Sequence, residues 1–220
     1  LPAGAADGDF TAAALTLVED GKAVHFPLSN GTQGVRGMAI SPDGRYLAVA
    51  HVLSRYQVPT TQLDRGWMNT NAVTVIDTDE PDKPHPVLLD DPDAGAANPW
   101  GVSFSGDGGK LFVTHAGTHE LSVIDFPALL ERMKREGRSN EPVSERLGFL
   151  HGLRARIALP LNGPRSVASD GKNVYVAGYF SDSLAEISLK DARKSRAIPL
   201  NAPFRPSREK LGERYFNDAS

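Results

Sequence analysis

The chain has 220 residues, 40% of them hydrophobic, and its 24 basic and 27 acidic residues give a formal net charge of -3. This balance leaves no basic patch for nucleic acid as a partner. The absence of cysteine excludes disulfides, thiolate metal sites and CxxCH haem attachment within these residues. No apolar run approaches the roughly 18 residues of a membrane span, and the length suffices to bury a core.

Two strands are predicted at the start of the chain, at 13–20 and 22–29, joined by an Asp-Gly turn. They are typical of the third and fourth strands of a four-stranded unit. Three complete units follow, with strands predicted at 35–41, 45–52, 71–78 and 85–90, then at 100–105, 109–115, 120–126 and 154–161, and finally at 164–169, 173–179, 183–189 and 195–200.

A pattern repeated three times indicates the architecture. It reads GMAISPDGRYLAVAH at 37–51, GVSFSGDGGKLFVTH at 101–115 and SVASDGKNVYVAG at 166–178. Each copy holds an apolar strand, an Asp-Gly turn and a second strand, and similar third strands follow (VTVIDT, LSVIDF and LAEISL). One four-stranded sheet per repeat predicts an all-β protein, a β-propeller with WD40-like blades.

About three and a half blades are present, whereas a closed propeller needs at least about four. We therefore expect the chain to be a fragment of a seven-bladed propeller, or to associate with another copy that completes it, because open strand edges aggregate. Propeller residues 1–204 comprise a partial blade at 11–30 and blades at 35–94, 99–161 and 164–200, and residues 205–220 are expected to form a linker.

Two insertions interrupt the repeat, at 53–70 and at 127–152. Residues 127–136 of the second insertion begin with proline and continue with an amphipathic pattern, which predicts a short helix. The first insertion is rich in arginine, aromatic and amide side chains. It predicts either a binding loop or a plug that packs Trp67 over the channel.

Strand direction alternates within a blade, and the first strand lines the channel. The turn entering strand one and the turn between strands two and three therefore share one face, called the top face below. Repeat equivalence places Arg36, Trp100 and Arg165 at the channel mouth, one per blade. The residues expected to form a ligand or partner face are Arg36, Arg55, Tyr56, Trp67, Trp100, His119, Arg165 and Tyr179.

Arginine forks suit carboxylates and other oxyanions. His51 and His115 are repeat-equivalent at the ends of second strands, and imidazoles suit copper, zinc or iron. These two histidines are therefore candidate metal ligands. The alternative is that they cap strand ends through hydrogen bonds from the ring to the backbone.

The segments GKLFVTHAGTHELSVID and GRYLAVAHVLSR…NAVTVID resemble the YVTN-type propeller repeat, with Tyr-Val-Thr-Asn followed by Ser-Val-Ile-Asp. The resemblance covers roughly residues 13–200. The Asn position is held by His51, His115 and Gly178, which puts the structural role of that Asn in doubt here. The resemblance implies a periplasmic, extracellular or cell-surface protein.

The segment KLGERYFNDAS (210–220) resembles the opening of a di-haem cytochrome c peroxidase-type domain, where a Gly-Glu-x-x-Phe segment and an Asp precede the first CxxCH. The insertion at 55–72 is similar to one in propellers fused to such domains. The resemblance implies a c-type haem in a following or partner domain and none within this chain. No haem ligand carries over to a residue of this chain.

Three functions follow as hypotheses. In the first, the chain is an extracytoplasmic module, non-catalytic by itself, that serves a fused or partner c-type haem redox protein in docking or substrate gating. In the second, it is a non-catalytic cell-surface scaffold for proteins or ligands. In the third, it is a metal-dependent enzyme that uses His51 and His115 at the channel mouth. No catalytic residue is predicted.

Overall fold

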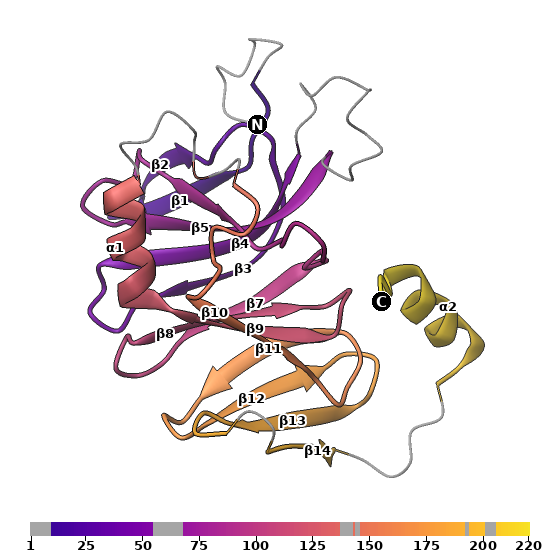
Figure 1. Ribbon diagram of the computed structural model, residues 1–220. Helices are drawn as coiled ribbons and strands as arrows, with labels where there is room; N and C mark the ends of the chain where they lie inside the picture. Colours follow the sequence, from indigo (N-terminus) through magenta and orange to yellow (C-terminus); the bar gives the residue numbers. More distant parts are fainter. Residues whose placement is uncertain (1–9, 55–67, 137–142, 144–145, 192–193, 201–205) are drawn as a thin grey trace.

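The computed structural model describes residues 10–54, 68–136, 143, 146–191, 194–200 and 206–220. Within these ranges, one two-stranded sheet and three four-stranded sheets are formed by consecutive antiparallel strands. The sheets stack in chain order, as Figure 1 shows. They are blades of a β-propeller, so the fold class predicted from the repeat is confirmed.

Each described strand falls where the sequence predicts one. The first sheet holds β1 (Ala14–Glu19) and β2 (Lys22–Pro27). The second holds β3 (Thr32–Ile40), β4 (Tyr46–Ser54), β5 (Asn69–Asp77) and β6 (His85–Leu88). The third holds β7 (Pro99–Phe104), β8 (Lys110–His115), β9 (Glu120–Asp125) and β10 (Arg154–Ala158). The fourth holds β11 (Pro164–Ser169), β12 (Asn173–Gly178), β13 (Ser183–Ser188) and β14 (Ser195–Pro199).

The Asp-Gly turns explain why the repeat is so regular. Ser41 donates a hydrogen bond of 2.5 Å to Asp43, and Ser105 donates one of 2.6 Å to Asp107 at the equivalent position. The glycine that follows Asp43 has a φ of 76°, a left-handed conformation that side chains other than glycine rarely adopt. The carboxylates in these turns are thus satisfied locally.

The first strands of successive blades, β3, β7 and β11, contact one another. Two glycines permit this approach. A Cβ atom on Gly37 would lie 2.1 Å from the carbonyl oxygen of Trp100, and one on Gly101 would lie 2.8 Å from that of Arg165. Glycine is therefore required where the inner strands cross. The residues just before these crossings, including Arg36, are brought together at one rim.

The core lies between the sheets. One cluster joins the second and third sheets, and another joins the third and fourth. Helix α1 (Phe126–Glu136) follows β9 directly and closes the first cluster with buried Phe126 and Leu129. The ring of Phe126 packs edge-on against Phe104, with centroids 4.9 Å apart. The helix predicted at 127–136 is confirmed.

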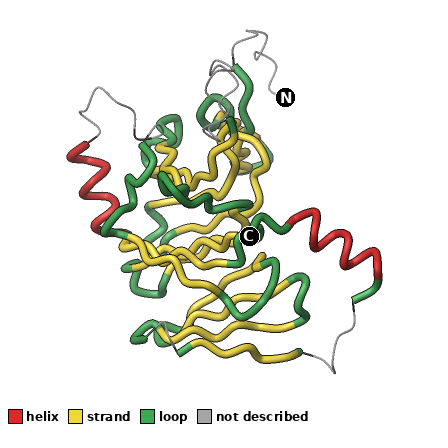
Figure 2. Tube along the Cα trace, turned by 45° about the vertical axis from the view of Figure 1, so that its right-hand side comes forward, coloured by secondary structure: helices red, strands yellow, loops and turns green. Residues whose placement is uncertain are grey.

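A second helix, α2 (Arg208–Asn217), was not predicted and falls within the expected linker. Ser207 caps it by accepting a hydrogen bond from the backbone of Lys210. Figures 1 and 2 show α1 and α2 on opposite sides of the stacked sheets. Among the described helices, none is long and apolar enough to cross a membrane.

Candidate functional site

The loops of the top face are held to one another by hydrogen bonds. Ala116 donates its backbone N–H to the carbonyl of Asn98 at 2.8 Å. Gly163 donates to Nδ1 of His119 at 3.1 Å, and Leu159 donates to the His119 carbonyl at 2.9 Å. Turns that are distant in sequence therefore form one fixed surface, as strand alternation predicts.

Five side chains on this surface form a row of alternating cations and aromatic rings, here called the cation–aromatic row. The guanidinium carbons of Arg36 and Arg165 lie 4.6 and 4.1 Å from the ring centroid of Trp100. Arg165 also lies 3.6 Å from the centroid of Tyr179, and Lys210 lies 4.4 Å from it. The structure thus unites four of the predicted face residues and adds Lys210.

The segment that carries α2 is held against the same surface. Nε2 of His119 lies 3.4 Å from Asp218, and Ala219 donates its backbone N–H to the carbonyl of Gly117 at 2.9 Å. Hydrogen bonds from the side chain and the backbone N–H of Ser220, together with the proximity of the His119 ring, lower the pKa of Asp218 to about 2. No side chain of α2 is fully buried, so polar contacts attach the helix to the propeller.

His51 and His115 lie inside the sheets with no exposed surface. Nε2 of His51 is 2.6 Å from the Thr74 hydroxyl, and Nε2 of His115 is 2.7 Å from the Ser122 hydroxyl. Each Nδ1 lies 3.1 Å from a backbone carbonyl and therefore carries the proton. Burial lowers the pKa of both rings, that of His115 to about 3.

Both nitrogens of each buried histidine are thus engaged within the fold. The observed contacts match the strand-end capping alternative, whereas a metal role for His51 and His115 stays a prediction. Among the described residues, no group of three or more His, Asp or Glu side chains is placed to hold a metal ion. The predicted face residues Arg55, Tyr56 and Trp67 lie outside the described residues.

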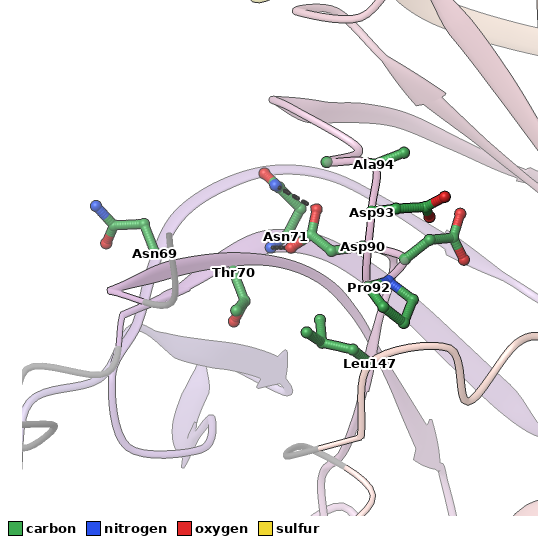
Figure 3. Close-up of a pocket in the computed structure, with 10 residues that line it drawn as sticks. Asn69, Thr70, Asn71, Asp90, Pro92, Asp93, Ala94 and Leu147 are labelled. Carbon is green, nitrogen blue, oxygen red and sulfur yellow. Dashed lines mark hydrogen bonds between the residues drawn. The ribbon is translucent and has the colours of Figure 1, made fainter. Parts of the chain in front are cut away.

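An open pocket of about 280 Å³ lies on the top face between β5 and the connection from β6 to β7 (Figure 3). Asp90 stands at its wall and accepts hydrogen bonds from the backbone N–H and the side-chain amide of Asn71, at 2.7 and 2.8 Å. A third bond comes from the backbone of Ala96 at 2.7 Å. These bonds give Asp90 a structural role, as expected for a carboxylate in a turn.

Asp91, which lines this pocket, belongs to a cluster of ion pairs. Asp91 accepts a bond of 2.5 Å from Arg154 and one of 3.1 Å from Arg156. Arg156 also pairs with Glu120. The Arg154 side chain is only 3% exposed, so its charge depends on Asp91 for compensation.

Lys210 and Asp218 were not predicted as site residues, because residues 205–220 were expected to form a linker. A signal was present. Ser207 is a good N-cap and precedes the helix-favouring run Arg-Glu-Lys-Leu. Reading that segment as a helix would have predicted the element, although not its place on the top face.

Comparison with known proteins relates the chain in sequence to hydrazine synthase subunit beta from Kuenenia stuttgartiensis. The two are 29% identical over 174 residues, which cover 77% of this chain and 45% of the relative. The chain thus spans less than half the length of that protein. No protein-family model matches the chain.

Solved structures agree with the observed architecture. Kuenenia stuttgartiensis hydrazine synthase superposes with a TM-score of 0.59 and 25% identity, over 80% of this chain and 55% of that chain. Virginiamycin B lyase from Staphylococcus aureus superposes with a TM-score of 0.55 and 14% identity, over 87% and 50%. The fold is that of a β-propeller. The lyase likeness concerns the fold alone.

Proposed function

We propose that this chain is a propeller module of a multi-component redox assembly, and that its top face is the surface that docks onto a partner. The observation that carries this proposal is the sequence relation to hydrazine synthase subunit beta, which spans 77% of the chain. A protein named as a subunit acts together with other chains, and we extend that role, as one component of an assembly, to this chain.

The chemistry of the two faces favours the top face. The opposite face presents Asp-Gly turns whose carboxylates are already bonded to neighbouring hydroxyl and N–H groups. The top face presents Trp100 and Tyr179 beside cations. Arginine and aromatic residues are enriched where protein interfaces concentrate their binding energy.

A c-type haem domain is the proposed partner, either fused or separate. Support comes from the resemblance of residues 210–220 to the opening of a cytochrome c peroxidase-type domain. These residues are held against the top face through Asp218 and Ala219. A haem domain attached to this segment would therefore stand beside the cation–aromatic row. The chain would act in docking or substrate gating, outside the cytoplasm.

The alternative is a non-catalytic cell-surface scaffold that binds proteins or ligands through the same face. The full engagement of His51 and His115 leaves no free imidazole nitrogen on either residue and so favours this scaffold over a metal-dependent enzyme that uses these histidines. The two functions differ in whether haem accompanies the chain.

Isolation of the affinity-tagged protein from its native source tests the proposal. We expect a stable assembly larger than the 23.6 kDa of this chain, positive for haem stain and for the Soret absorption. If the haem component is a separate chain, the Trp100→Ala variant should lose it, and Arg45→Gln, on the opposite face, should retain it. A haem-free protein that binds other partners would support the scaffold instead. Retention of a separate haem chain by Trp100→Ala would contradict docking through this face.

A further inference from the structure

Two arginines of the cation–aromatic row lack the carboxylate partners that the other strand arginines have. Arg154 binds Asp91, Arg156 binds Asp91 and Glu120, and Arg196 binds Glu186. Among the described residues, no hydrogen bond or ion pair joins Arg36 or Arg165 to a carboxylate, and Nε of Arg165 is buried without a hydrogen-bond partner. The fold therefore holds two uncompensated guanidinium groups at one rim.

The two positive charges lie close together against one indole ring. Both guanidinium carbons lie within 4.6 Å of the centroid of the Trp100 ring. Their separation is thus shorter than the screening length of about 10 Å in 0.1 M salt, so the two charges repel each other. The backbones behind them are locked by the glycine crossings at Gly37 and Gly101. An anion bound beside the two guanidinium groups would offset the repulsion between them.

We propose, on the basis of the docking role given above to the top face, that Arg36, Trp100 and Arg165 form a binding site for carboxylate groups. The guanidinium groups donate charge-assisted hydrogen bonds to the carboxylate oxygens. Trp100 orients both arginines through cation–π contacts and restricts their side-chain freedom. Arginine is the side chain whose planar fork matches a carboxylate.

The C-terminal helix supplies the competing negative charge inside the protein. Glu213 of α2 pairs with Lys210 at 2.8 Å, and the charge of Arg165 contributes to lowering the pKa of Glu213. Arg165 does not form an ion pair with Glu213 in the described residues. The negative charge of Glu213 thus acts on Arg165 without a direct ion pair. A carboxylate from outside has to compete with this attraction when it binds Arg165.

Titration of the ¹⁵N-labelled chain followed by NMR tests the proposal without any haem protein. One arm uses citrate, and the other uses a hexaglutamate peptide that represents an acidic segment of a partner. We expect saturable shifts of the Nε–H signals of Arg36 and Arg165 and of the Trp100 indole. Arg36→Gln and Arg165→Gln should each weaken binding about tenfold or more. Glu213→Gln should strengthen binding severalfold.

Arg45→Gln is the matched control, because Arg45 also lies over an aromatic ring, Tyr46, but on the opposite face. It should bind as the wild type does. Tighter binding of hexaglutamate than of citrate would assign the site to acidic protein segments, and the reverse would assign it to small acids. Shifts that do not saturate, or an equal loss of affinity in Arg45→Gln, would overturn the proposal.

Arg165→Gln removes a side chain that packs on three rings, those of Trp100, Tyr179 and Phe180, so the thermal unfolding of this variant is recorded in parallel. Arg36 is exposed, and Arg36→Gln therefore keeps the test valid if Arg165→Gln unfolds. The isolation from the native source tests the haem partner, and this titration tests the carboxylate site, so either proposal can be refuted while the other stands. Loss of carboxylate binding with haem still bound would refute only the site, and the opposite result would refute only the haem partner.

Discussion

The Ser122 hydroxyl donates a hydrogen bond of 2.7 Å to Nε2 of His115 and so joins the second and third strands of one blade inside the core. The same bond recurs in the preceding blade between Thr74 and His51 at 2.6 Å. In the last blade, glycine and alanine replace both partners together. A buried imidazole and a hydroxyl thus act as one structural unit that is present or absent as a pair.

This pairing predicts that the stability of the protein falls in acid. The pKa of His115 is about 3 in the folded state and 6.5 ordinarily. Between these two values the unfolded chain binds a proton at His115, whereas the folded chain does not. The contribution of His115 to the free energy of unfolding should be constant above about pH 7. Between about pH 6.5 and pH 3 this contribution should fall by about 1.4 kcal/mol per pH unit. Urea unfolding at several pH values measures it.

His115→Asn removes the titration and restores the residue that is usual in the YVTN-type repeat. We expect a shallower pH dependence of stability than in the wild type. His85→Asn is the control, because His85 is exposed and should leave the dependence unchanged. An unaltered slope in His115→Asn would show that other groups cause the acid sensitivity.

The close crossing of β3 and β7 predicts that any side chain larger than that of glycine at position 37 destabilises the fold. Its Cβ would meet a backbone carbonyl that cannot move aside, so Gly37→Ala should destabilise the fold by about 3 kcal/mol. Gly106→Ala should change stability by less than about 0.5 kcal/mol, because nothing lies within 4 Å of its Cβ position. Equal midpoints of thermal unfolding for the two variants would refute the close approach of β3 and β7.

Most of the strand pattern was predictable from sequence, because the Asp-Gly turn and the following alternation are local signals. The capping of strand ends by the His115 ring was one of the two alternatives drawn from the sequence. Its Ser122 partner was not predictable, since repeat position locates a residue along its strand and not its hydrogen-bond partners. Arg154 and Asp91 are 63 residues apart in the sequence, so no local sequence pattern predicts their ion pair. The row through Arg36, Trp100 and Arg165 was foreseen because repeat equivalence is a long-range signal.

The buried guanidinium of Arg154 predicts a cost for removing its partner. Asp91→Ala should lower the free energy of unfolding by about 3 kcal/mol, since a largely buried charge would lose its compensation. Asp93→Ala, two residues away and exposed, should have little effect. Denaturant titration compares the two variants. An equally small effect of Asp91→Ala would mean that backbone carbonyls suffice for Arg154.

Attachment of α2 by polar contacts predicts that it can be released without unfolding the propeller. Asp218→Asn weakens the pairing with His119 and should speed amide hydrogen exchange across Arg208–Asn217. Exchange in β8 and β9 should stay as in the wild type. Asp82→Asn, an exposed carboxylate on the opposite face, serves as the control. Unchanged exchange in α2 would show that other contacts hold the helix.

Hydrogen exchange of the isolated chain against the same chain in its native assembly tests the central claim most directly. We predict added protection in the top-face segments 97–101, 116–120 and 178–182, and none in the Asp-Gly turns at 41–45 and 105–109. Added protection confined to those turns, or none in any segment, would contradict docking through the top face.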